Sequence, residues 1–213
     1  QQAREPHALL FMTILHRRFG IDEFADAGAR YDQVLPEHPE RAPVLRVFRR
    51  VFDAENPVVP EDWDHVTIPT DQLLVTALYC DRLGLPESFA EGLERAVSQG
   101  GYGLTHAVLA WAWAKENGTD LVLSDEFLEK MYGGAAGIID ADPTSVDDVK
   151  LEAGAFLCIA RQSERVNLEF VQRVLMYQNE DGGWGAANDS NWHATILALM
   201  IVMHVRITDR RSA

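Results

Sequence analysis

The sequence is poor in positive charge. It contains 19 Lys and Arg residues against 33 Asp and Glu residues, which gives a net charge of −14 at pH 7. A nucleic-acid-binding surface needs cationic side chains that replace the counterions of the phosphates. An anionic membrane surface attracts the same groups. The charge balance therefore argues against a nucleic-acid partner and against docking on an anionic membrane.

Long apolar runs and the common catalytic signatures are also missing. No apolar run approaches the roughly 18 residues needed to cross a bilayer, so no membrane span is expected and the chain should be soluble. The phosphate loop, the dinucleotide-binding glycines, the serine elbow, Cys-x-x-Cys and the zincin motif are absent. The Cys-Gly-Glu-Gln sequence of thioester proteins is absent too. These absences exclude the classes of protein that such motifs mark.

Cysteine is scarce as well. The two cysteines, Cys80 and Cys158, lie in apolar helical stretches, so buried free thiols are expected. The sequence starts with Gln1 and Gln2 and has no initial Met, as in a mature protein after removal of a signal peptide. A secreted or periplasmic location is therefore expected, with a trimmed chain and a cytoplasmic location as the alternative.

Helical periodicity, in contrast, extends along almost the whole chain, and no alternating strand pattern exceeds four residues. Some predicted helices are apolar on nearly every side, whereas those between them are amphipathic. A helix that is apolar all round is buried, and an amphipathic helix covers it from outside. The sequence thus predicts one all-α domain over residues 1–213, with inner and outer helices in alternation. The inner helices are predicted at Ala8–Leu15, Leu73–Tyr79, Ala107–Ala114, Ala153–Ala160 and Ala194–Met203, and the outer helices at Pro39–Phe52, Glu87–Val97, Asp125–Met131 and Leu168–Tyr177.

Similar glycine-rich joints recur between these helices. QGGYG occupies residues 99–103, DGGWG occupies 181–185, and a related YGG occupies 132–134. Paired glycines can adopt the positive φ that ends a helix, and the neighbouring aromatic ring can fill the gap between repeats. A unit of two helices repeating every 35–45 residues or so indicates either an open solenoid or a closed ring.

The last of these joints resembles a known motif. QNEDGGW at 178–184 resembles the QW motif of terpene cyclases (Gln, a few residues, Gly, any residue, Trp), and WHATILAL at 192–199 is similar to the inner helix that follows it there. The resemblance covers about the last 40 residues and extends more weakly back to about Pro69. It implies the α/α toroid of terpene cyclases, protein prenyltransferase β-subunits and complement-type thioester domains. That fold hosts unrelated chemistries, so the resemblance leaves the activity open.

The starts of the inner helices share a chemical pattern. His7, His106 and His193 each precede an alanine at the first apolar turn, and Asp71 and Glu152 occupy the corresponding places in the other two helices. In a ring, these positions would converge on the central cavity. Neutral imidazoles and a carboxylate are ligands for Zn²⁺, Fe²⁺ or Mn²⁺, and a helix N-terminus favours neutral imidazole. We therefore predict a divalent metal, zinc or iron, bound by His7, Asp71, His106 and His193. The alternative for the two carboxylates is capping of their helices.

Two carboxylates near the fourth inner helix are the candidate catalytic groups. Asp148 and Glu152 are four residues apart, so they share one face of a helix. One of them could bind the metal while the other acts as a general base, with a pKa raised by burial. The alternative is that Asp147 or Asp148 only caps the helix.

The same segment also resembles part of a cyclase motif. Residues 147–150, Asp-Asp-Val-Lys, resemble the Asp-Asp-Thr-Ala end of the acid motif of class II terpene cyclases. Ser145 corresponds to the first Asp of that motif, and Lys150 would partly neutralise the acid that alkene protonation requires.

Aromatic residues near the inner helices are candidate substrate-binding groups. Trp111, Trp192 and Tyr102 could line a pocket for an apolar or cationic ligand, and packing in the core is the alternative. Our leading hypothesis is a metal-dependent hydrolase or lyase that acts on a small molecule. The second is a non-catalytic module that holds an apolar ligand or a protein partner. The third is a shortened relative of terpene cyclases that uses carboxylate acid chemistry. The sequence leaves the substrate and the oligomeric state open.

Overall fold

The protein is all-helical, as predicted. A computed structural model describes residues 5–186 and 189–211, with side chains as far as Val205 in the last helix. Within these ranges the regular structure is helical except for a small antiparallel pair, β1 (Gly185–Ala186) and β2 (Asp189–Ser190). The Gln1-Gln2 start, on which the expectation of export rests, lies outside the described residues. Among the described residues, no helix is long and apolar enough to cross a membrane.

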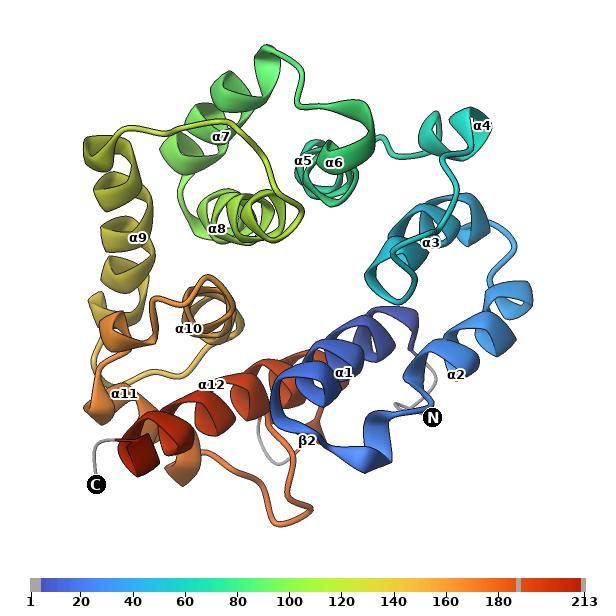
Figure 1. The fold of residues 1–213 in the computed structure, drawn as a ribbon. Helices are drawn as coiled ribbons and strands as arrows, with labels where there is room; N and C mark the ends of the chain where they lie inside the picture. Colours follow the sequence, from blue (N-terminus) through green and yellow to red (C-terminus); the bar gives the residue numbers. More distant parts are fainter. Residues whose placement is uncertain (1–4, 187–188, 212–213) are drawn as a thin grey trace.

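Five helices form the apolar centre of the molecule at the places that the hydrophobic pattern predicted. In space, α5, α8, α10, α12 and α1 contact one another in that order, and Figure 1 draws them around the middle of the molecule. Their facing side chains, such as Leu109, Leu157 and Ile201, are almost completely buried. Burying one such side chain contributes roughly 1.5–3 kcal/mol, so these contacts dominate the stability of the fold. The five helices are α1 (Pro6–Phe19), α5 (Pro69–Leu78), α8 (Gly101–Glu116), α10 (Asp148–Ile159) and α12 (Trp192–Arg211).

Amphipathic helices cover this centre from outside, in the order in which they alternate along the chain (Figure 1). Helix α2 packs on α1, α7 packs on α5 and α8, α9 packs on α8 and α10, and α11 packs on α12. In α11, Phe170 and Val174 face inward and are buried, whereas Leu168 and Met176 are exposed. The apolar stripe of each helix thus decides which face meets the centre. These helices are α2 (Ala27–Val34), α7 (Ser88–Gln99), α9 (Asp125–Asp140) and α11 (Leu168–Met176).

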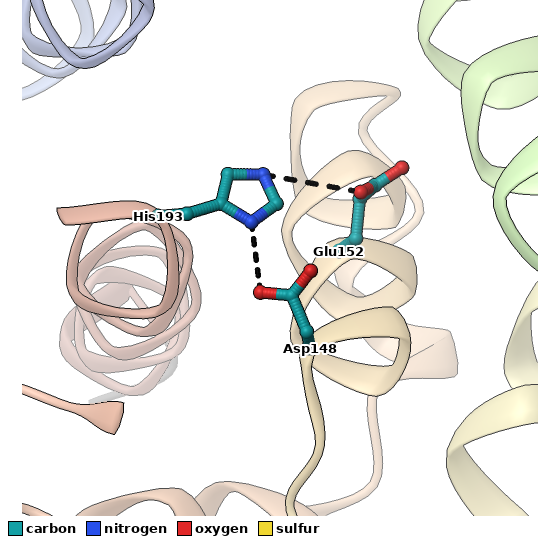
Figure 2. A group of neighbouring side chains, drawn as sticks. All are labelled: Asp148, Glu152 and His193. Carbon is teal, nitrogen blue, oxygen red and sulfur yellow. Dashed lines mark hydrogen bonds and ion pairs between the residues drawn. The ribbon is translucent and has the colours of Figure 1, made fainter. Parts of the chain in front are cut away.

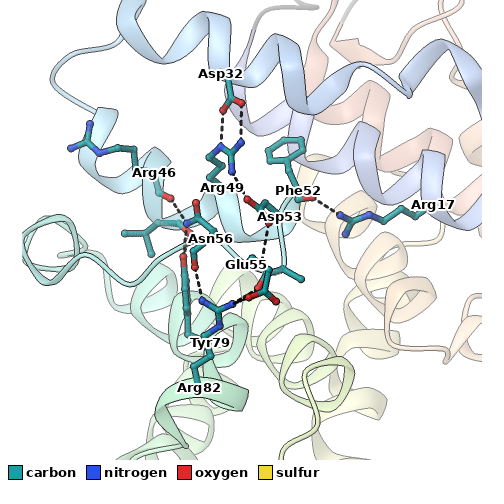
Figure 3. Close-up of polar contacts among 12 residues, drawn as sticks. Arg17, Asp32, Arg46, Arg49, Phe52, Asp53, Glu55, Asn56, Tyr79 and Arg82 are labelled. Carbon is teal, nitrogen blue, oxygen red and sulfur yellow. Dashed lines mark hydrogen bonds and ion pairs between the residues drawn. The ribbon is translucent and has the colours of Figure 1, made fainter.

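The segment between α1 and α5 consists of short helices, turns and loops. Polar contacts hold these pieces together (Figure 3). The Arg49 guanidinium bridges Asp32 and Asp53, with N–O distances of 2.8 and 2.9 Å. The buried Asn56 amide donates to the Tyr79 hydroxyl at 2.7 Å, so the loop after α3 is tied to the end of α5. The short elements here and elsewhere are α3 (Ala42–Phe48), α4 (Pro60–Trp63), α6 (Cys80–Leu83) and the 3-10 turns η2 (Asp22–Phe24), η3 (Leu35–Glu37), η4 (Arg49–Val51) and η5 (Ser163–Arg165).

The glycine joints behave as predicted in two places and differently in the third. Gly100 and Gly182 have φ values of 68° and 84°, and the chain turns there. The expected stop at Gly133-Gly134 is wrong, because α9 continues through both residues to Asp140. A Cβ at Gly134 would lie 3.0 Å from the Leu104 side chain. Glycine at this position therefore allows a close approach of α9 to α8 rather than a turn.

The tryptophan of the QW-like segment closes the joint between α11 and α12. Trp184 is buried, and its indole Nε1 donates to the Val174 carbonyl at 2.6 Å. Its backbone amide donates to the Thr195 hydroxyl at 3.0 Å. Through its ring and its backbone amide, Trp184 thus ties the end of α11 to the first turn of α12.

The C-terminal ends of the central helices are held by Arg18, from the last turn of α1. Its guanidinium donates to the Ile159 carbonyl at 2.8 Å, lies 2.9 Å from the Glu116 carboxylate, and lies 3.0 Å from the His204 ring. These contacts join α1 to α10, α8 and α12 at one end of the molecule.

Both cysteines are free and buried, which confirms the sequence prediction.

Candidate metal centre

Three potential metal ligands meet where α10 and α12 begin (Figure 2). Asp148 and Glu152 lie one turn apart on α10, and His193 projects towards them from the first turn of α12. Each offers one ligand atom, and these atoms all lie within 4.8 Å of one another. Glu152 is buried, whereas Asp148 and His193 are partly exposed. The shared helix face predicted for the two carboxylates is thus present.

The start of α10 explains why Asp148 is available. The Asp147 side chain caps the helix by accepting from the Lys150 backbone amide at 3.0 Å. Because Asp147 satisfies this amide, Asp148 in the first helical turn can direct its carboxylate to other partners. Of the two capping candidates, Asp147 is therefore the cap.

Asp148 holds His193 in one orientation. Its Oδ1 lies 2.8 Å from His193 Nδ1, and its Oδ2 accepts from the Tyr102 hydroxyl at 2.8 Å. The hydrogen bond from His193 lowers the pKa of Asp148 against the effect of partial burial, and Tyr102 adds to the lowering. With an ionised carboxylate accepting at Nδ1, the proton of neutral His193 sits on that nitrogen. The lone pair is then on Nε2, the nitrogen available to a metal.

His193 Nε2 faces the buried carboxylate across a gap. It lies 4.0 Å from Glu152 Oε2, beyond the range of a hydrogen bond. Two ligand bonds of roughly 2.0–2.2 Å each place the two ligand atoms about 3.4 Å apart at a tetrahedral angle and at most about 4.4 Å apart. The gap between these two atoms is therefore wide enough for one metal ion held by both.

The second carboxylate oxygen of Glu152, Oε1, has hydrogen-bond partners within the protein. The Thr105 hydroxyl donates to Oε1, and His106 Nδ1 lies 2.9 Å from the same oxygen. A buried carboxylate requires such partners, because an unpaired charge in the interior is strongly destabilising. With Oε1 engaged by α8, Oε2 is the oxygen turned to His193. Both partners come from the first turns of α8, which packs against α10.

His106 lies beside Glu152, and its surroundings favour the protonated ring. Its Nδ1 also lies 2.8 Å from the Tyr102 carbonyl. Burial by itself would lower the pKa of His106, but Glu152, the Tyr102 carbonyl and Asp71 outweigh it and raise the pKa above its usual value. Asp71 is itself partly buried, which raises its pKa, with His106 acting in the opposite direction. Asp71 thus interacts electrostatically with His106 and is not one of the three clustered residues.

His7 occupies the edge of the site. Burial and the Arg41 guanidinium, 3.1 Å from its Nδ1, lower its pKa to about 4, so it is neutral near pH 7. Its ring stacks on Trp192 at 6.3 Å, and Trp192 also contacts the His193 ring edge-on at 5.1 Å. Trp192 therefore lies between the two histidines.

The structure groups the predicted site residues differently from the predicted ligand set. Of the four predicted metal ligands, His193 belongs to the three-residue group, together with the predicted catalytic residues Asp148 and Glu152. His7, Asp71 and His106 are not members of that group. Their positions along the helices correspond, but a side chain's direction around its helix changes by about 100° per residue. Equivalent places in sequence therefore did not bring all ligand atoms to one point.

The aromatic residues divide in the same way. Tyr102 reaches the site through Asp148, and Trp192 lies at its edge. Trp111 is nine residues further along α8, roughly 13 Å from Tyr102 along the helix axis. It lines a separate cavity of about 440 Å³ together with Lys115 and Tyr132.

One expectation about the site is wrong, and one contact in the site was not predicted. Lys150 does not approach Asp148, so the expected neutralisation is wrong. Its ammonium group turns back to the preceding loop and donates to the Asp142 carbonyl and to Ser145 Oγ, the latter at 2.8 Å. The contact of Thr105 with Glu152 was not predicted, because a single threonine in an apolar helix carries no recognisable signal.

Comparisons with protein-family models, curated proteins and solved structures found no match for this chain. Functional inference therefore depends on the arrangement of its own side chains.

Proposed function

We propose that this protein binds one divalent metal ion, zinc or iron, and acts as a metal-dependent hydrolase or lyase on a small-molecule substrate. The observation that carries the proposal is the 4.0 Å separation between His193 Nε2 and the buried Glu152 Oε2. Glu152 and His193 would hold the ion, and Asp148 would keep His193 in its ligand tautomer. Two protein ligands, one fewer than in typical catalytic zinc sites and two fewer than in structural ones, leave coordination positions for water and substrate.

The residues around the ligands suit acid–base chemistry. A bound divalent ion would supply Lewis-acid polarisation of water or of a substrate group. His106 has a pKa above its usual value, so it carries a proton over more of the neutral range than an ordinary histidine. It lies in contact with Glu152 and partly exposed, where it can donate a proton to a leaving group. Tyr102 and Trp192 would line the approach to the ion.

The carboxylates favour this function over terpene-cyclase-like acid chemistry. Protonation of an alkene requires a carboxylic acid that keeps its proton. Asp148 has a lowered pKa because it accepts hydrogen bonds from His193 and Tyr102, so it is ionised near neutral pH. An ionised Asp148 serves better as the partner of a metal-binding histidine.

We further propose that the helices close into an α/α toroid of the kind that the QW-like segment implies. Helix α3 supports closure, because the Tyr79 hydroxyl donates to the Val47 carbonyl at 3.0 Å and the His7 and Phe48 rings meet at 6.4 Å. These contacts connect α3, which was predicted as part of an outer helix, to both α5 and α1. In that place α3 would complete a circuit of central helices (Figure 1). The metal site would then lie at one mouth of the ring.

The secreted or periplasmic location stays a prediction, which fractionation of the producing cells checks.

Metal titration of the purified protein tests the proposed function. The metal-free protein is titrated with Zn²⁺ and, without oxygen, with Fe²⁺, by calorimetry together with elemental analysis. We expect one ion per chain, and loss of binding in His193→Ala and Glu152→Gln. His65→Ala is the matched control, because His65 is exposed and lies outside the site. No bound ion in the wild type, or unchanged affinity in folded His193→Ala, would refute the proposal.

A further inference from the structure

A concave site lies between α5 and α7, apart from the candidate metal ligands. It is a cavity of about 390 Å³, within the size range of small-molecule sites. Trp63 and Val66, from the segment before α5, form one side of it. Neither Asp148, Glu152 nor His193 lines it. Its apolar wall consists mainly of Val66, Leu73, Val75, Phe89 and Ala96.

The cavity has one kind of charge. Arg95 is the charged residue of its lining, and the remaining polar residues there are Thr, Ser and Gln. Arg95 has a carboxylate neighbour in Glu91, one turn away on α7. That pair is 3.9 Å apart and mostly exposed, so it constrains the guanidinium little. In a chain with a net charge of −14, a cavity lined by a cation and no carboxylate favours an anionic ligand over a cationic one.

The ring of Trp63 forms a rigid aromatic part of the cavity wall. The indole Nε1 of Trp63 is buried, and no acceptor among the described residues binds it. The ring itself is fixed by an edge-on contact with Tyr79 at 5.4 Å. Because Nε1 has no accessible surface, a ligand in the cavity contacts the ring of Trp63 and not this donor.

We propose that this cavity binds a small amphipathic anion, with an aromatic or branched apolar body and one carboxylate or sulfonate group. The apolar body lies between α5 and α7 against the Trp63 ring, and the anionic group pairs with Arg95. The site is independent of the metal centre. Its ligand can be a substrate-like metabolite or a regulator, and both share this chemistry.

Two fluorescent probes of similar shape test the proposal on the 213-residue chain. The anionic probe is 8-anilinonaphthalene-1-sulfonate, and the neutral probe is N-phenyl-1-naphthylamine, which lacks the sulfonate. We expect the anionic probe to bind with one-to-one stoichiometry. Arg95→Gln should weaken it about tenfold, the loss of one charge-assisted hydrogen bond, and leave the affinity for the neutral probe within about twofold.

Glu91→Gln is the matched control, because it changes one charge on the same face of α7 without removing the guanidinium. We expect it to leave affinity for the anionic probe unchanged or increased. Thermal unfolding of each variant establishes that it is folded before its affinity is compared. Unchanged affinity of folded Arg95→Gln for the anionic probe would overturn the proposal. An equal loss for both probes would overturn it too. His193→Ala should bind the probe normally, so failure here is distinguishable from failure of the metal site.

Discussion

The Asp148 carboxylate and the His193 ring meet with 2.8 Å between Oδ1 and Nδ1. This contact joins the first turns of α10 and α12 and places the proton of neutral His193 on the nitrogen that faces Asp148. The opposite nitrogen, Nε2, is thereby left to face Glu152 at 4.0 Å. Asp148 thus contributes to the site mainly by orienting a ligand, a role that its place beside the cap residue Asp147 does not reveal.

The first prediction separates the orienting role of Asp148 from the effect of its negative charge on metal affinity. Asp148→Asn should weaken zinc binding by roughly tenfold to a hundredfold, because the amide no longer fixes the His193 tautomer. Asp147→Asn removes the same charge one residue away, and asparagine caps a helix as well as aspartate does. It should therefore leave zinc affinity nearly unchanged. Competition with a chromophoric chelator measures both affinities, and equal losses in the two variants would contradict the prediction.

A second prediction concerns the proton on His106. Glu152→Gln should lower the pKa of His106, because the neutral amide no longer stabilises the imidazolium. Asp71→Asn should lower it by a smaller amount, since Asp71 contributes less than Glu152. Titration of the ring protons by NMR measures both shifts. A His106 pKa that stays the same in Glu152→Gln would show that the pair is not formed in solution.

The third prediction is a pH dependence of stability at the opposite end of the molecule. His204 Nδ1 donates to the Met200 carbonyl at 2.7 Å, and Nε2 accepts from Arg18 at 3.0 Å. Burial, with a further contribution from Arg18, lowers the pKa of His204 to about 4 from 6.5. Between these values the unfolded chain binds the additional proton, so stability should fall as the pH drops from 6.5 to 4.

His204→Gln removes that titration and should flatten the curve of unfolding free energy against pH in this window. Urea unfolding at several pH values measures it. Some slope should remain, because His7 also has a pKa of about 4 in the folded protein. A curve as steep as that of the wild type would show that His204 does not stay neutral.

A fourth prediction tests the joint between α11 and α12. Trp184→Phe keeps an aromatic ring but removes the hydrogen bond to the Val174 carbonyl, so it should cost about 1–3 kcal/mol of stability. Trp192→Phe, at a partly exposed position, is the comparison and should cost less. Urea unfolding measures both, and an equal loss in the two variants would assign no special role to the buried indole.

Local features of the fold were predictable because they depend on neighbours in sequence. All-round apolar segments identified the central helices, and amphipathic segments identified α7, α9 and α11. The same kind of reasoning failed at Gly133-Gly134, which looked like a helix stop and lies inside α9. Gly134 instead allows a close contact with Leu104 on α8, and no local sequence pattern predicts such a contact.

The sequence by itself determined which helices are central and that histidines and carboxylates occur where they begin. Only the tertiary structure decided which of these side chains meet. His193 faces Asp148 and Glu152, whereas His7 turns to Arg41 and His106 to the far oxygen of Glu152. The physical reason is that hydrophobic periodicity fixes which side of a helix is buried, while the direction of each polar side chain depends on how neighbouring helices are rotated and shifted against one another.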